Sequence, residues 1–334
     1  MDISIIIVNW NAKEYLLSCL ASIEETAGEC TKEIIVVDNA SGDGSAAALE
    51  ADFPNVQVIR SEDNLGFAKA NNLGISKSRG RYVCLVNPDV IVLAACIPAL
   101  VEMMDRNPRV GLAGPRMLNP DGTLQPSCRR SPTLWSGICT ALYLPRLFPR
   151  AAMFSDCLMR YWPHDTMRKV ESLTGSFWIA RREAIDDVGL LDEEFFLYGE
   201  DIDWCKRFWL GGWEVLFAPV GQAIHHGGAS SANTPVACFV EKRKASVRVW
   251  GKYHGRVSTV AHVLILLFRD GVRLVLNVVW YVLCPAQRGV TRKKIVSHWA
   301  CVRWLSCRRA RAPRDSARTG PSQTGDGLVI NERK

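Results

Sequence analysis

The sequence lacks the closely spaced cysteine pairs that bind structural zinc. Its twelve cysteines are scattered between Cys19 and Cys307, with no CxxC pair and no cysteine–histidine spacing typical of a zinc site. A zinc-binding module is therefore excluded as the organising feature of the fold. We expect these thiols to be reduced, as thiols are in a cytosolic compartment.

The GxGxxG fingerprint of dinucleotide-binding folds is also missing. Gly42 and Gly44 have the first spacing of that motif, but the third glycine does not follow, which disfavours a dinucleotide site. Residues 3–8 form an apolar run that is preceded by neither a basic segment nor a small-residue cleavage site. We therefore expect no signal peptide.

The strongly apolar stretch at residues 257–284 lacks the uninterrupted length of a membrane span. Arg269, Asp270 and Arg273 divide it into two pieces of about a dozen residues, too short to cross ~30 Å of hydrocarbon. Each central charge would cost roughly 2.5 to 3.5 kcal/mol there. We expect amphipathic helices that lie in the membrane interface. A re-entrant hairpin and a buried pair of core helices remain alternatives.

Charge is distributed unevenly along the chain. Residues 1–241 carry 21 basic and 30 acidic side chains, whereas residues 242–334 carry 20 and 4. Basic clusters and aromatic residues of the second part suit a membrane surface: 242–244, 292–294, 303–311, Trp280, Tyr281, Trp299 and Trp304. We expect a membrane-associating helical region at 241–311 and a disordered tail at 312–334.

Buried strands and amphipathic helices alternate in the first part of the chain. Apolar runs near residues 3–8, 33–37, 56–60 and 82–86 predict strands, and helical patterns of 10 to 15 residues separate them. This alternation is typical of an α/β fold with a mostly parallel, doubly wound sheet. We expect one such domain over residues 1–240.

Polar side chains follow the predicted strands at the point where each ends: Asn9, Asp38, Asn64, Asn87 and Asp89. Each one alone is typical of a turn or helix cap. Together they would share the carboxyl edge of one sheet, where α/β proteins bind their ligands. In the turn at residues 87–89, an aspartate after a proline suits a metal ion or a diphosphate. This edge is therefore a candidate ligand-binding site.

Further candidates lie between residues 173 and 226. Gly175 interrupts a predicted strand where a ligand or backbone would approach closely. Glu200 and Asp201 follow Gly199 at the start of a predicted helix, where carboxylates either cap the helix or include a positioned base. Of the adjacent histidines at 225 and 226, at most one is expected to bind a metal.

Several blocks of the sequence, taken in order, resemble glycosyltransferase family 2, which has the GT-A fold, and within it the branch of bacterial rhamnosyltransferases. The resemblance extends from residue 3 to about residue 231. It rests on the blocks SIIIVNWN, IIVVDNASGDGS, NLGFAKANNLGI, NPDV, GSFWIARREAIDDVGLLDEEFF and YGEDIDWCKR.

The resemblance implies a role for each candidate. Asp38 would bind the nucleotide base, Asn64 and Asn72 would shape its pocket, and Gly175 would line the donor sugar. Asp89 and His225 would bind Mg²⁺ or Mn²⁺ at the donor diphosphate, and Asp201 would be the catalytic base. One departure is Asn87, because the family usually has an aspartate there, and this puts metal affinity in question.

The expected function is that of an inverting glycosyltransferase at the cytoplasmic face of the inner or plasma membrane. It would move a sugar, by resemblance rhamnose from dTDP-rhamnose, to a lipid-linked or polysaccharide acceptor in cell-surface glycan synthesis; a UDP-sugar is the alternative donor. A sugar-1-phosphate nucleotidyltransferase and a non-catalytic protein that binds a nucleotide sugar or a membrane are the alternative functions. No nucleic-acid partner is expected, because the basic tail has no recognisable nucleic-acid module.

Overall fold

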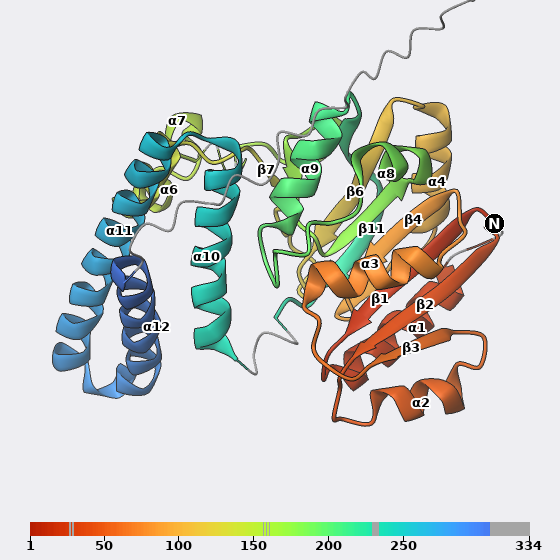
Figure 1. Cartoon of the computed structure of the whole chain (residues 1–334), viewed down its shortest axis with the longest axis horizontal. Coiled ribbons are helices and arrows are strands. Elements are labelled where there is room, and N and C mark those ends of the chain that lie inside the picture. Colours follow the sequence, from red (N-terminus) through yellow and green to blue (C-terminus); the bar gives the residue numbers. More distant parts are fainter. Residues whose placement is uncertain are drawn as a thin grey trace, which may run out of the picture.

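A mixed sheet of nine strands organises the described part of the chain (Figure 1). The computed structural model describes residues 1–26, 28, 30–155, 157, 159, 161–228 and 234–307. The strand order is β3-β2-β1-β4-β10-β6-β11-β5, and β8 pairs with β11 outside this path. A separate two-stranded sheet pairs β7 with β9.

The parallel half of the sheet confirms the alternation expected from the sequence. Its strands are β1 (Ile3–Asn9), β2 (Lys32–Asn39), β3 (Gln57–Ser61) and β4 (Tyr82–Val86). All four run in the same direction, with β1 between β2 and β4. Ile and Val dominate β1 and β2 because both faces of these strands are covered. Asn9 and Asp38 consequently lie side by side at the carboxyl ends.

The other half of the sheet is mixed. Its strands are β5 (Val90–Val92), β6 (Val110–Leu118), β8 (Arg168–Lys169), β10 (Phe177–Arg181) and β11 (Glu214–His225), and the small sheet consists of β7 (Cys128–Arg129) and β9 (Ser172–Leu173). β10 is antiparallel to both β4 and β6, and β11 is parallel to β6 but antiparallel to β5. The last residue of β11, His225, is thereby paired with Val90, next to the polar turn after β4.

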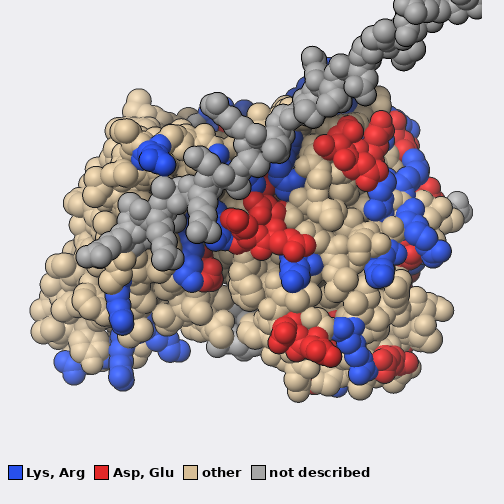
Figure 2. Space-filling view, viewed as in Figure 1, with Lys and Arg blue, Asp and Glu red and all other residues tan. Residues whose placement is uncertain are grey.

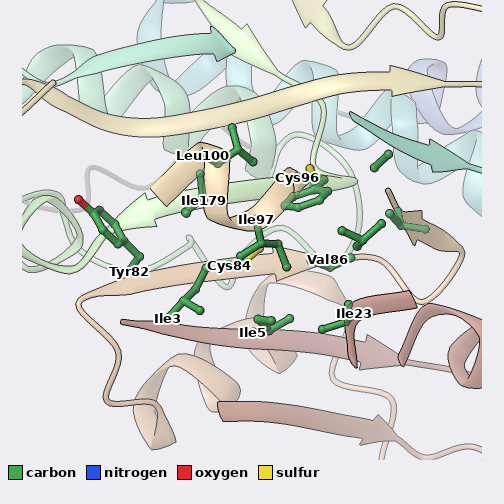
Figure 3. Close-up of a cluster of buried hydrophobic side chains, with 14 of the residues drawn as sticks. Ile3, Ile5, Ile23, Tyr82, Cys84, Val86, Cys96, Ile97, Leu100 and Ile179 are labelled. Atoms are coloured by element: carbon green, nitrogen blue, oxygen red, sulfur yellow. The ribbon is translucent and has the colours of Figure 1, made fainter. Parts of the chain in front are cut away.

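Helices cover both faces of this sheet. They are α1 (Lys13–Thr26), α2 (Ser45–Asp52), α3 (Phe67–Lys77), α4 (Cys96–Arg106), α8 (Arg182–Val188) and α9 (Glu200–Leu210). Side chains of α1 and α4, such as Ile23, Ile97 and Leu100, pack against Ile3 and Ile5 on one face (Figure 3). Helices α3, α8 and α9 pack on the opposite face.

A helical bundle stands beside the sheet domain (Figure 1). It consists of α10 (Pro235–Tyr253), α11 (Arg256–Leu283), the short helix η3 (Pro285–Gln287) and α12 (Arg288–Cys307), and α5 (Leu134–Ala141) packs on α11. Two short helices, α6 (Leu144–Leu147) and α7 (Ala152–Ser155), pack on α5. The boundary expected after residue 240 falls inside α10, and the tail expected at 312–334 lies outside the described residues.

The stretch that Arg269, Asp270 and Arg273 divide in the sequence lies within one continuous helix, α11, of 28 residues. These charges do not interrupt the helix because they face the inside of the bundle. Asp270 is fully buried and accepts hydrogen bonds from Arg243 of α10 and His298 of α12. Within the described residues, no helix combines the length and the hydrophobicity needed to cross a membrane.

The amphipathic pattern of α11 is inverted relative to an ordinary bundle helix. Its buried residues are His262, Leu266 and Asp270. Its outward stripe is apolar and recurs at helical spacing: Val257, Val260, Leu264, Phe268, Val275, Val279 and Val282, each between 48% and 86% exposed. Exposed apolar residues of the neighbouring helices α5 to α7 include Trp135, Leu142, Leu147, Phe148 and Met153. A large apolar surface therefore faces outward on this side of the molecule.

Candidate functional site

The carboxyl ends of β1 and β2 bring Asn9, Asp38 and Ser41 together. The Nδ2 atom of Asn9 lies 3.4 Å from Oδ1 of Asp38 and donates to Oγ of Ser41 at 3.1 Å. Oδ1 of Asn9 is buried and has no hydrogen-bond partner among the described residues. Because buried polar atoms are rarely left unpaired, this oxygen is suited to accept a hydrogen bond from a ligand.

An open cavity of about 510 Å³ begins at Asp38. Most of its wall consists of small residues from the turn after β2 and the start of α2, and its other wall is the end of β3. The lining residues are Asp38, Ala40, Ser41, Gly42, Gly44, Ala46, Ala47, Arg60, Ser61 and Glu62. The small side chains leave room for a flat ring, and Asp38 supplies an acceptor for a ring N–H.

Asn64 and Asn72 make internal hydrogen bonds and do not line this cavity. Oδ1 of Asn64 accepts from Nδ2 of Asn39 at 3.0 Å and from the N–H of Gly66 at 3.0 Å. The amide of Asn72 donates to the carbonyl of Leu191 and accepts from its N–H, at 2.8 and 3.0 Å. Any part that these side chains take in donor binding would therefore be indirect, through the start of α3 and the loop before α9.

The polar turn after β4 places Asp89 beside His225. Oδ1 of Asp89 is 3.3 Å from Nε2 of His225, and both side chains are largely buried. The backbone N–H of Asn87 donates to the carbonyl of Ser176 at 2.9 Å, which joins this turn to the segment that contains Gly175. The structure thus brings together the two residues that the sequence predicted as metal ligands.

Gln125 fixes the ring of His225. Its Nε2 donates to the His225 carbonyl at 3.0 Å, so its Oε1 faces Nδ1 of the ring at 2.7 Å. Nδ1 therefore donates to Oε1, and Nε2 is the ring nitrogen that faces Asp89. A turn beginning at Asn119 positions Gln125, whose N–H donates to the Met117 carbonyl at 2.9 Å. Sequence reasoning missed Gln125, because it is 100 residues from its partner.

The pair Asp89 and His225 fits a divalent cation. Two ligands on neighbouring vertices of an octahedral ion, each about 2.1 Å from it, lie roughly 3 Å apart, close to the distance between these atoms. No group of three or more His, Cys, Asp or Glu side chains suited to a metal occurs within the described residues. The protein would therefore supply two ligands, and diphosphate or water oxygens would complete the shell, as Mg²⁺ commonly requires.

Gly175 lies in the turn between β9 and β10, where a larger residue would require its neighbours to shift. A Cβ atom at this position would lie 3.3 Å from two ring carbons of Trp178 and 3.7 Å from the ring of Phe67. Trp178 is buried and packs on Trp204 of α9. The neighbours of Gly175 are thus protein side chains, and its role toward a donor sugar stays a prediction.

The three carboxylates at the start of α9 have different environments. Asp203 is fully buried and bonded to Tyr253 at 2.7 Å and Arg207 at 2.9 Å, so it is structural. Glu200 is 5% exposed, and its Oε2 has no hydrogen-bond partner among the described residues. Asp201 is partly exposed, and its Oδ1 accepts only a local bond, from the N–H of Ile202 at 2.9 Å.

Burial raises the pKa of both Glu200 and Asp201. For Glu200 the pKa lies well above its usual value, and the neighbouring Asp201 charge raises it further. For Asp201 the positive charge of Arg129 opposes the effect of burial. Asp201 is therefore the more readily deprotonated of the two carboxyl groups, and it is also the more accessible one. This arrangement suits a proton acceptor at Asp201 beside a carboxyl group that retains its proton more readily.

The mixed sheet, the polar strand ends and the added helices constitute the GT-A fold of nucleotide-sugar transferases. The structure resembles the mannosyltransferase PcManGT from Pyrobaculum calidifontis, solved with GDP-Man and Mn²⁺, at a TM-score of 0.52 and 15% identity over 90% of this chain and 87% of that one. It also resembles GalNAc-T7, solved with UDP, GalNAc and Mn²⁺, at a TM-score of 0.53 and 17% identity over 76% of this chain and 48% of that one.

The chain belongs to glycosyltransferase family 2. The model of that family matches residues 4–189. The sequence is 30% identical over 253 residues to N-acetylglucosaminyl-diphospho-decaprenol L-rhamnosyltransferase of Mycobacterium tuberculosis, covering 72% of this chain and 81% of that relative. It is 26% identical over 229 residues to the low-salt glycan biosynthesis hexosyltransferase Agl10 of Haloferax volcanii, covering 67% of each.

Proposed function

We propose that this glycosyltransferase is inverting and metal-dependent and transfers rhamnose from dTDP-rhamnose to a lipid-linked acceptor in cell-surface glycan synthesis. The observation that carries the proposal is the pair Asp89 and His225 at the strand ends, 3.3 Å apart, together with an accessible carboxylate at the start of α9. The sugar and the acceptor class follow the rhamnosyltransferase relative. A UDP-sugar is the alternative donor, and a polysaccharide the alternative acceptor.

Donor binding is assigned to the strand ends. Asp38 would accept a hydrogen bond from the base in the adjoining cavity, and Asn9 has an unpaired oxygen beside it. Asp89 and His225 would hold Mg²⁺ or Mn²⁺, which would neutralise the charge that develops on the leaving diphosphate. Asn87 stands where the family usually has an acid, so these two side chains carry the protein's share of the metal binding.

Catalysis is assigned to Asp201. Its carboxylate would accept the proton of the acceptor hydroxyl as that oxygen attacks the anomeric carbon, opposite the departing diphosphate. Attack from the opposite face inverts the anomeric configuration. Glu200 is an unsuitable base because it is buried and its pKa is raised well above the usual value. In its protonated form it would instead lie beside Asp201 without adding a second negative charge.

Peripheral attachment to the cytoplasmic face of the inner or plasma membrane is part of the proposal. The apolar stripe of α11 supports it, because apolar side chains face outward while Asp270 lies inside. On the view in Figure 2, acidic side chains gather mainly over the sheet domain, and the bundle exposes mostly uncharged and basic residues. Such a surface suits the interface of an anionic membrane.

The proposed reaction is tested first by binding and then by turnover. In a thermal-shift panel, a dTDP or UDP nucleotide should raise the melting temperature more with Mn²⁺ than without it, and D89N should remove the metal-dependent part. D201N should retain that shift but lose roughly 10²- to 10⁴-fold in sugar transfer, as loss of a general base does. Near-normal turnover by D201N would contradict the assignment of the base.

Vesicle binding tests the membrane contact separately. Leu264→Glu and Phe268→Glu, on the outward stripe of α11, should weaken sedimentation with anionic vesicles. Leu210→Glu is the matched control, because Leu210 is 68% exposed but lies at the end of α9. Equal binding by all three variants and the unaltered protein would contradict the assignment of this surface.

A further inference from the structure

The basic side chains of α10 are paired with acids, with one exception. Helix α10 carries five of them: Lys242, Arg243, Lys244, Arg248 and Lys252. Four of these pair with a carboxylate: Arg243 with Asp270, Lys244 with Glu241, Arg248 with Glu194 and Lys252 with Asp192. No carboxylate of the described residues pairs with Lys242. Lys242 therefore differs from the other four basic residues of α10, each of which forms an ion pair.

Lys242 lies close to the start of α9, the helix that carries the proposed base Asp201. Its Nζ is 4.5 Å from the ring centroid of Tyr198, two residues before Glu200. The side chain is accessible to solvent, although neighbouring groups surround much of it. Burial and then the positive charge of Arg129 lower the pKa of Lys242.

Arg129 flanks the same helix, α9, from the small sheet, because β9, the partner strand of β7, packs on α9. It is the last residue of β7, is paired with Ser172 of β9, and its charge acts on both Asp201 and Lys242. The Nε atom of Arg129 is buried and has no hydrogen-bond partner among the described residues. Part of its guanidinium is therefore ready to donate to a bound group.

Two neighbouring cations repel each other, and a bound anion would reverse that effect. The planar guanidinium of Arg and the ammonium of Lys are the usual protein ligands of phosphate. The donor diphosphate is assigned to Asp89 and His225, whereas Arg129 acts on the proposed base. The anion at this second position therefore belongs to the acceptor.

We propose that Arg129 and Lys242 bind the phosphate groups that join the acceptor sugar to its lipid. The inference rests on the proposed function, because it takes the acceptor to be lipid-linked. Helix α10 also packs on α11, whose outward face is apolar. Phosphate held by α10 and β7 would thus lie between the lipid-facing helices and Asp201, with the sugar hydroxyl directed to the base.

Binding of geranyl diphosphate to the full chain, measured by calorimetry in buffer with a chelator, tests the proposal without requiring turnover. R129Q and K242Q should each weaken binding about 10- to 100-fold, as expected for loss of a charged hydrogen bond to phosphate. K244Q is the matched control on the same helix and should bind like the unaltered protein. Unchanged binding by R129Q and K242Q would overturn the proposal.

D89N distinguishes the acceptor position from the donor position. If the probe occupied the donor site, D89N would change its affinity and K242Q would not, and this result would also overturn the proposal. If the proposal holds, D89N leaves the affinity for geranyl diphosphate unchanged. Failure of the proposed function would give a different result. The unaltered protein would then transfer no sugar, whether or not it binds geranyl diphosphate.

A kinetic comparison separates phosphate recognition from support of Asp201. The unaltered enzyme should use a lipid diphosphate-linked sugar with a lower KM than a neutral alkyl glycoside of the same sugar. K242Q and R129Q should lose this preference by raising KM for the first acceptor only. An equal loss of kcat on both acceptors would mean that the two cations act only on the fold or on the base, and would refute phosphate binding.

Discussion

Replacing Asp270 by Asn should destabilise the bundle by about 3 to 5 kcal/mol, the usual effect of removing one partner of a buried ion pair. The Asp270 side chain is 0% exposed, and those of Arg243 and Arg269 are only 11% and 12% exposed. Arg243 donates to both carboxylate oxygens, at 2.7 and 3.1 Å. Asn has nearly the same volume, so the change removes the charge without opening a cavity. Two largely buried guanidinium groups would then face no anion.

Urea unfolding followed by tryptophan fluorescence and far-UV circular dichroism measures this effect. E102Q is the matched control, because Glu102 pairs with Arg106 on an exposed surface, where such pairs contribute about 0.3 to 0.5 kcal/mol. D270N/R243M should recover part of the loss, since one unpaired cation is then gone. If D270N were no more destabilising than E102Q, the reasoning from buried charge would be refuted.

The difference between the unaltered protein and D270N should also depend on pH. Burial alone would raise the pKa of Asp270, but hydrogen bonds from His298 and Arg243 outweigh it and hold this pKa below its usual value of 3.8. A carboxyl with a lowered folded-state pKa stabilises the protein above its unfolded-state pKa and loses that contribution as pH falls. The stability difference should therefore be full near pH 7 and shrink below about pH 4.

Three further changes concern residues near the proposed metal site and α9. Gln125→Leu should weaken Mn²⁺-dependent donor binding about 10- to 100-fold by releasing the ring of His225, whereas Gln125→Glu should weaken it less. An unchanged Mn²⁺ concentration for half-maximal donor binding would contradict this. Glu200→Gln should raise the melting temperature at pH 8 and not at pH 4. A carboxyl whose folded-state pKa is raised destabilises the folded protein as pH rises above its usual pKa of 4.5, and Gln removes this effect. Equal shifts at both pH values would count against this reasoning. Tyr253→Phe should lower the unfolding free energy by about 1.5 to 3 kcal/mol through loss of its bond to Asp203, measured in urea; an effect below 0.5 kcal/mol, on the order of a neutral surface change, would be inconsistent with that bond.

The parallel half of the sheet could be predicted because its signals are local. A strand buried on both faces is a continuous apolar run, and the polar residue after it marks the ligand-binding edge. Asn9, Asp38 and Asp89 were found in this way. The pairing of Asp89 with His225 was implied only by the family resemblance, because it depends on the antiparallel pairing of β5 and β11.

The contacts that could not be predicted join distant parts of the chain. Gln125 and His225 are 100 residues apart, and Asp203 and Tyr253 are 50 apart. No periodicity connects such pairs. The surroundings of the charges in α11 could not be predicted for a related reason, since a sequence shows that Asp270 is charged but does not show that Arg243 and His298 surround it.

Helix α10 makes the bundle part of the catalytic unit and not merely an appended anchor. Its Ala245 and Val249 pack on Phe195 just before α9, and a Cβ at Gly199 would lie 3.0 Å from Ala245. Its last residue, Tyr253, holds the buried Asp203 of α9. Division of the chain at residue 240 would remove these contacts from the helix that carries Asp201. The position of the proposed base therefore depends on α10, which in turn packs on the helix that exposes the apolar surface.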